Sequence, residues 1–87
     1  MNLAETIKTR LATLNPVSLE IQDDSAQHVG HEGNTGGGHF SLKIVSSQFS
    51  QKSQIIRHRL IYQALADLIP QQIHALSILA ISPDDPK

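Results

Sequence analysis

Hydrophobic side chains follow a helical spacing at the start of the chain. They recur every three or four positions, at Leu3, Ile7, Leu11 and Leu14. This spacing is typical of a helix with one apolar face. Asn2 is a candidate cap for its start. Asn15 is expected to end it, because a residue that precedes proline avoids helical backbone angles.

The spacing then changes to strict alternation, which predicts two strands. The first runs from Val17 to Gln22, with every second side chain apolar. The second begins near Phe40 and alternates up to Val45. Between them lies a glycine-rich polar segment, residues 26–38. A segment of this length suits the enlarged tip of an antiparallel hairpin, and long loops in small domains are often functional.

A second helical pattern follows these strands. Its apolar face is predicted to hold Ile56, Leu60, Ala64, Leu65 and Leu68. Ser53 is a candidate N-cap, and the helix is expected to run to about Ile69, just before Pro70. An apolar run of strand length, about Ile73 to Ile81, completes the pattern. Both of its faces are largely apolar, so we expect the strand to be covered on one side and flanked on the other.

The order of these elements predicts an α+β fold. It reads α-β-β-α-β, or α-β-β-α-α-β if the second helical region is split. A strand, a helical crossover and another strand place the two strands parallel, so the sheet is mixed and three-stranded with helices packed on one face. We expect one domain over residues 1–82, followed by a short proline-rich tail, residues 83–87.

Composition narrows the functional class. The 87 residues carry a formal net charge of −1, so no overall field attracts nucleic acid or a membrane. The absence of cysteine excludes disulfides and any thiolate metal site built by this chain alone. We see no signal peptide and no apolar run of membrane-spanning length, which predicts a cytoplasmic protein. No nucleophile–base pair stands out, so we predict that it is not an enzyme.

Histidine supplies the chain's main metal-binding chemistry. The five histidines are His28, His31, His39, His58 and His74. Neutral imidazole is a common ligand for iron, zinc and copper. His28 and His31 lie three residues apart in the glycine-rich segment, where they are either solvated or metal ligands. His39 is interpreted as a packing or strand-edge residue. His74 begins the last strand and is either a hydrogen-bonded core residue or a ligand.

Arg57, His58 and Arg59 form a small basic cluster in the second helix. Positions 57 and 59 do not share a helix face. The cluster is therefore either a solvated flank or a surface for an acidic partner or a phosphate backbone. Residues 33–36 match the G-x-x-G pattern of KH nucleic-acid domains, but they fall between predicted strands instead of helices. We interpret that match as chance.

Four segments of the chain resemble BolA-like proteins. They are LEIQDDS (residues 19–25), HFSLKIVSSQF (39–49), RHRLIYQAL (57–65) and IHALSI (73–78). Together they cover most of the predicted domain in the order found in that family. The resemblance implies an α-β-β-α-α-β fold of type-II-KH-like topology, which agrees with the order predicted from the hydrophobic pattern.

The resemblance also implies a function. BolA-like proteins pair with monothiol glutaredoxins of the CGFS type, and the heterodimer binds a [2Fe–2S] cluster in iron–sulfur assembly, trafficking or iron regulation. The histidine of the HAL motif corresponds to His74. In the histidine-loop subgroup a second ligand follows the first strand, and it maps best onto His28, with His31 a close competitor. Two imidazoles on one iron have a precedent in Rieske centres.

On this hypothesis the thiolates come from the glutaredoxin and its bound glutathione. The isolated chain is then expected to bind no cofactor and to be a monomer or a weak homodimer. Two alternatives stay open. The KH-like fold implies a nucleic-acid-binding transcriptional regulator that uses Arg57 and Arg59. A zinc domain would use His28, His31 and His74, and the fourth position would be either open or filled by a carboxylate such as Glu32. The short segment after the last strand departs from relatives that continue with a helix or tail.

Overall fold

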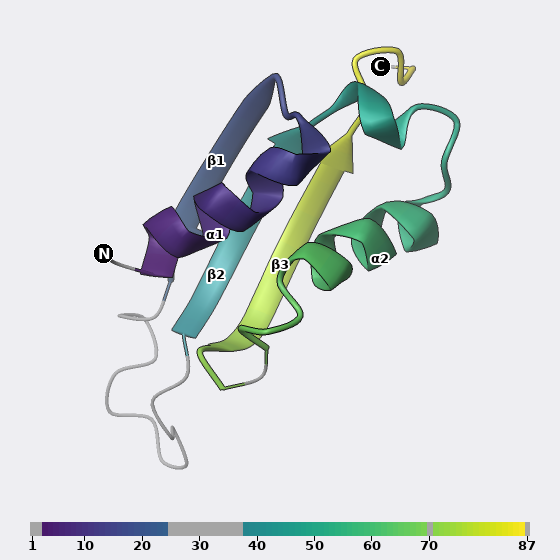
Figure 1. The fold of residues 1–87 in the computed structure, drawn as a ribbon. Helices are drawn as coiled ribbons and strands as arrows, with labels where there is room; N and C mark the ends of the chain where they lie inside the picture. The colour runs from purple at the N-terminus through teal and green to yellow at the C-terminus, as the bar shows by residue number, and fades with distance from the viewer. Residues whose placement is uncertain (1–2, 25–37, 70, 87) are drawn as a thin grey trace.

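The structure consists of a sheet with a layer of helices on one side. It is a computed structural model that describes residues 3–24, 38–69 and 71–86. The sheet is three-stranded, and the helices α1 (Leu3–Leu11) and α2 (Gln54–Ala64) lie on the same face of it (Figure 1). The predicted α+β class and the one-sided helix layer are confirmed. Neither of these helices is long and apolar enough to cross a membrane.

The sheet has the mixed topology that the element order predicts. Strand β1 (Ser18–Asp23) pairs antiparallel with β2 (Gly38–Val45), and β2 pairs in parallel with β3 (Ile73–Ile81). The spatial order is β1-β2-β3, so β2 is central and the other two strands are edges. The end of β1 and the starts of β2 and β3 therefore meet at one end of the sheet, the lower end in Figure 1.

The first helix follows its sequence pattern closely. Ile7 and Leu11 are fully buried, and Leu14 is buried in the 3-10 turn η1 (Ala12–Leu14) that extends α1. Asn15 then adopts a left-handed conformation with φ 49°, and its N–H donates to the Ala12 carbonyl oxygen. Asparagine tolerates this backbone geometry better than most residues. The predicted helix stop is confirmed.

The second helix begins as predicted but ends earlier. The Ser53 hydroxyl accepts a hydrogen bond from the Ile56 N–H at 3.2 Å, which is the expected N-cap. The α-helix stops at Ala64, and the chain turns until the Leu68 carbonyl oxygen accepts the N–H groups of Gln72 and Ile73, both at 2.9 Å. The expected continuation to Ile69 is wrong. The turns give the chain room to reverse before β3.

The buried face of α2 differs from the predicted one. Leu65 and Leu68 are buried as predicted, but Ile56, Leu60 and Ala64 are only half-buried. The helix instead buries Arg57 and Ile61. The buried face of the helix includes Arg57, which is not hydrophobic. A prediction from hydrophobic spacing alone therefore selects residues one position away from those that are buried.

The core lies between the sheet and the helices. Among the described residues, twelve buried hydrophobic side chains make it up: Ile7, Leu11, Leu14, Phe40, Leu42, Ile44, Phe49, Ile61, Leu65, Leu68, Ile73 and Ala80. In β3 burial alternates along the strand, and Ser77 and Leu79 are exposed. The expected cover on one side of this strand is confirmed, because both helices pack on the same side of the sheet.

Candidate metal centre

A β-bulge sets the position of His74 at the start of β3. Gly38 pairs with Ile73 and the next residue, His39, pairs with Ala75, so His74 is an extra residue in β3. Such a bulge twists the strand locally and re-aims a side chain, often beside a functional site. The His74 side chain is exposed. The structure therefore excludes the interpretation of His74 as a core residue.

Gly38 makes this close pairing possible. Its N–H donates to the Gln72 carbonyl oxygen at 3.0 Å. A Cβ at this position would lie 2.5 Å from the Phe40 ring and 3.2 Å from the same carbonyl oxygen. Only glycine fits without moving backbone or ring. It lets β2 approach the turn before β3, directly beside the bulge.

The bulge brings His74 next to a second imidazole, His39. The centroids of the two rings are 5.4 Å apart and their planes are tilted by 50°. His39 is half-buried. From the sequence, His39 is predicted to be a packing or strand-edge residue, and its place beside His74 was missed. The sequence did hold a clue to this pairing, because His39 and His74 lie at the starts of two strands that are predicted to be parallel neighbours.

At this end of the sheet the two imidazoles lie near Asp24, whose carboxylate accepts a hydrogen bond from the Ser41 hydroxyl. Among the residues that the structure describes, no group of three histidine or acidic side chains could enclose a metal ion. The sequence has no cysteine. The predicted ligands His28 and His31 lie outside the described residues. This chain can therefore offer imidazole to a metal centre, while thiolate ligands must come from another molecule.

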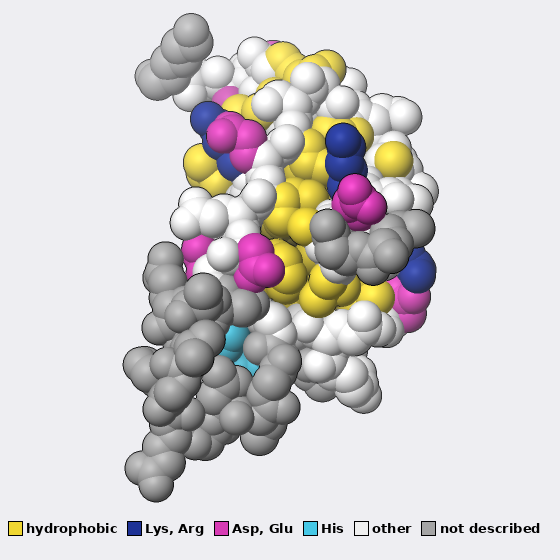
Figure 2. Space-filling model, turned by 90° about the vertical axis from the view of Figure 1, so that its left-hand side faces the viewer, with side chains coloured by type: hydrophobic (Ala, Val, Ile, Leu, Met, Phe, Trp, Pro, Cys, Tyr) yellow, Lys and Arg dark blue, Asp and Glu magenta, His cyan; other side chains and the backbone are white. Residues whose placement is uncertain are grey.

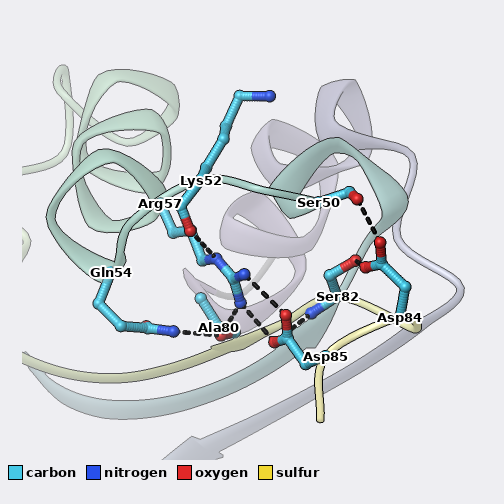
Figure 3. Close-up of polar contacts among 8 residues, drawn as sticks. All are labelled: Ser50, Lys52, Gln54, Arg57, Ala80, Ser82, Asp84 and Asp85. Carbon is cyan, nitrogen blue, oxygen red and sulfur yellow. Dashed lines mark hydrogen bonds and ion pairs between the residues drawn. The ribbon is translucent and has the colours of Figure 1, made fainter.

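The opposite end of β3 holds a network centred on Arg57 (Figure 3). The guanidinium donates from Nη1 and Nη2 to the two carboxylate oxygens of Asp85, at 2.6 and 2.8 Å. Its Nε donates to the Lys52 carbonyl oxygen at 2.9 Å, and Nη1 also donates to the Ala80 carbonyl oxygen at 3.1 Å. Arg57 is only 5% exposed.

This burial corrects the predictions for the basic cluster. Arg57 is neither a solvated flank nor a surface contact, because its donors are used inside the fold. The adjacent Arg59 is exposed and His58 is half-buried. Of the three residues predicted to bind a partner, these two alone retain exposed surface.

The same network binds the end of the chain to the domain. The Ser82 N–H donates to Asp85 at 3.0 Å, and the hydroxyls of Ser50 and Ser82 both donate to Asp84. The hydrogen bond from Arg57 is the largest cause that lowers the pKa of Asp85 to about 2. Hydrogen bonds from Ser50 and then Ser82 lower the pKa of Asp84. The segment predicted as a tail therefore packs against the domain through its two aspartates.

Comparison with known proteins places the chain in a family. A family model described as BolA-like protein matches residues 11–85. The chain belongs to the BolA-like family. A solved structure of BolA1 from Arabidopsis thaliana matches this BolA-like chain with a TM-score of 0.81 and 38% identity, and the match covers 99% of each chain.

Two curated plant relatives of this BolA-like chain are longer than it is. SufE-like protein 1, chloroplastic/mitochondrial, of Arabidopsis thaliana is 49% identical over 76 residues, which are 80% of this chain and 20% of that protein. Protein BOLA1, chloroplastic, of the same plant is 39% identical over 89 residues, covering 97% of this chain and 56% of that protein. Their names point to organelles, so the cytoplasmic location of this chain stays a prediction.

Proposed function

We propose that this BolA-like chain is a non-enzymatic adaptor that pairs with a monothiol CGFS glutaredoxin and supplies His74 as a ligand of a shared [2Fe–2S] cluster. The observation that carries the proposal is the exposed imidazole at the bulge of β3, in a chain without cysteine. Such a chain can provide imidazole ligands to a cluster, while the thiolate ligands come from its partner. When bound, the cluster would present iron atoms that thiolate and imidazole ligands can coordinate.

The residues around His74 fit this role. The bulge fixes the ring at the edge strand β3, where a partner meets no intervening strand. The backbone bond between Gly38 and Gln72 holds the two strands together directly beside it. His74 thus lies on a strand of the sheet at an accessible edge, and binding groups placed on strands are positioned more precisely than those on loops.

A second ligand is proposed from the glycine-rich segment. His28 is the better candidate from the resemblance, and His31 is the alternative. His58 and Arg59 remain candidates for contact with the glutaredoxin surface. Imidazole ligation is lost when the ring is protonated, so a cluster held this way is expected to be labile in acid.

The test is reconstitution of the mixture. The chain is combined with a CGFS glutaredoxin, glutathione, iron and sulfide, and its visible circular dichroism spectrum is compared with that of the glutaredoxin homodimer. We expect a distinct spectrum that co-elutes with a heterodimer on size exclusion. A spectrum identical to the homodimer, with the two proteins eluting separately, would contradict the proposal.

The competing function, nucleic-acid binding, has lost one of its supports because Arg57 is buried. In the face shown by Figure 2, basic and acidic side chains lie beside each other and border a hydrophobic area, without a basic stripe. Phosphate-backbone binding weakens steeply as salt rises. A duplex-binding assay at low and physiological salt separates the two functions, and we expect no affinity at either concentration.

A further inference from the structure

We propose that His39 and His74 form a chelating pair through which the isolated chain binds a single divalent transition-metal ion, with Zn²⁺ as the reference ion. This site differs from the zinc site considered from sequence, which drew on His28, His31 and Glu32. It also needs no glutaredoxin, so it stands independently of the proposed function.

The spacing of the two rings matches a shared metal ion. Zinc binds imidazole nitrogen at about 2.0–2.1 Å, which places the ion roughly 3.2 Å from each ring centre. Two rings at a tetrahedral angle then have centres about 5.2 Å apart. The observed separation of 5.4 Å is close to this value. The separation of the two ring centres is therefore compatible with one nitrogen of each ring binding a common ion.

The backbone holds the pair at this distance. His39 lies on β2 and His74 on β3, and these strands are joined by parallel pairing with the bulge between them. A preorganised pair spends less conformational entropy on binding than two flexible histidines. A ring ligates through one nitrogen while the other commonly donates to a neighbour. Coordination therefore does not require either imidazole to be without another contact.

Asp24, which lies near the two histidines, makes its hydrogen bonds within the sheet. The Asp24 N–H donates to the His39 carbonyl oxygen at 2.7 Å, and the Asp24 carboxylate accepts hydrogen bonds from the Ser41 hydroxyl and the Gln22 amide. These bonds compete with any role as a metal ligand. The proposed protein ligands are thus the two imidazoles, and water would fill the remaining positions of a tetrahedral ion.

The experiment is a calorimetric titration of the isolated chain with zinc chloride, without glutaredoxin or glutathione. We expect one ion per chain for the wild type. Loss of an outer-shell partner of a metal ligand already weakens binding by about 10–100-fold. The variants His39→Ala and His74→Ala should each therefore lower zinc affinity at least about 100-fold. Circular dichroism of each variant checks that its fold is intact.

Two further variants decide where the ion binds. The His58→Ala variant removes a histidine on α2, and zinc affinity should stay as in the wild type. An equal loss in this variant would indicate non-specific binding to imidazole and overturn the proposal. Retained affinity in His39→Ala, loss only in the His28→Ala/His31→Ala double variant, or no zinc binding by the wild type would also overturn it.

Discussion

The two ends of β3 use polar side chains in opposite ways. At its C-terminal end Arg57 is buried and bound to Asp85, and Ser50 and Ser82 donate to Asp84. At its N-terminal end His74 is exposed on a bulge beside His39. The first group closes the fold, and the second presents donors at an accessible edge. One arginine of the charged cluster in the sequence, Arg57, is therefore structural, and two histidines far apart in the sequence form the candidate site.

The largest expected effect on stability comes from breaking the Arg57 network at the C-terminal end of β3, which we call the closed end. Arg57→Leu removes the guanidinium that donates to the Asp85 carboxylate and to two backbone carbonyl oxygens, so Asp85 keeps the Ser82 N–H but loses its cationic partner. Hydrogen bonds to charged groups are among the stronger ones, and removing one partner leaves the other unsatisfied. We expect the greatest loss of unfolding free energy among the variants considered, measured by urea denaturation.

The matched control is the neighbouring exposed arginine. Arg59→Leu should change the unfolding free energy by no more than about 0.5 kcal/mol. Equal losses from Arg57→Leu and Arg59→Leu would show that the network does not close the domain.

A glycine substitution tests the N-terminal end of β3, where His74 is exposed beside His39. Gly38→Ala places a Cβ 2.5 Å from the Phe40 ring, so the ring or the strand must move. Overpacking of this kind costs about 1–3 kcal/mol. We also expect weaker zinc binding, because the displaced strand carries His39. Ser77→Ala, at an exposed position of β3, is the control for both measurements. A stable Gly38→Ala variant with unchanged zinc binding would contradict this account of the bulge.

The closed end also predicts a pH dependence. The pKa of Asp85 lies at about 2, below its ordinary value of 3.8, so its contribution to stability is complete well above pH 3.8. That contribution is lost as the pH falls toward about 2, because the unfolded state takes up the proton first.

Asp85→Asn should be less stable at neutral pH and show a flatter profile below pH 4 than the wild type, in urea unfolding at several pH values. Asp67→Asn is the control, since its pair with Arg10 is 54% and 42% exposed. Identical acid profiles for the wild type and Asp85→Asn would exclude Asp85 as a source of the pH dependence.

The effect of histidine substitution on stability is expected to be the smallest. His74 is exposed, so His74→Ala should alter the unfolding free energy by about 0.5 kcal/mol at most. A large loss measured by urea denaturation would assign this imidazole to the structure of the domain.

The sequence was sufficient for most of the fold because its hydrophobic periods change clearly from helix to strand. The alternation of Phe40, Leu42 and Ile44 predicted β2, and the crossover predicted its parallel pairing with β3. The sequence did not predict the burial of Arg57, because the charge pattern does not reveal that Asp85, far along the chain, supplies a partner. A buried arginine is recognised only when its acceptors are known.

The pairing of His39 with His74 also required the structure. It depends on a one-residue bulge, and the sequence shows only a glycine before one of the histidines. The ligand role of His74 itself was suggested by the family resemblance. The assignment of the second ligand to His28 or His31 stays a prediction, because both lie outside the described residues.

The central claim is that His74 is this chain's fixed ligand to the cluster shared with a CGFS glutaredoxin. The most direct test compares visible circular dichroism of reconstituted mixtures that contain wild-type chain, His74→Ala, or Gln72→Ala as the exposed neighbouring control. We predict a heterodimer spectrum for the wild type and Gln72→Ala, and only the homodimer spectrum for His74→Ala. A heterodimer spectrum that persists unchanged in His74→Ala would contradict the claim.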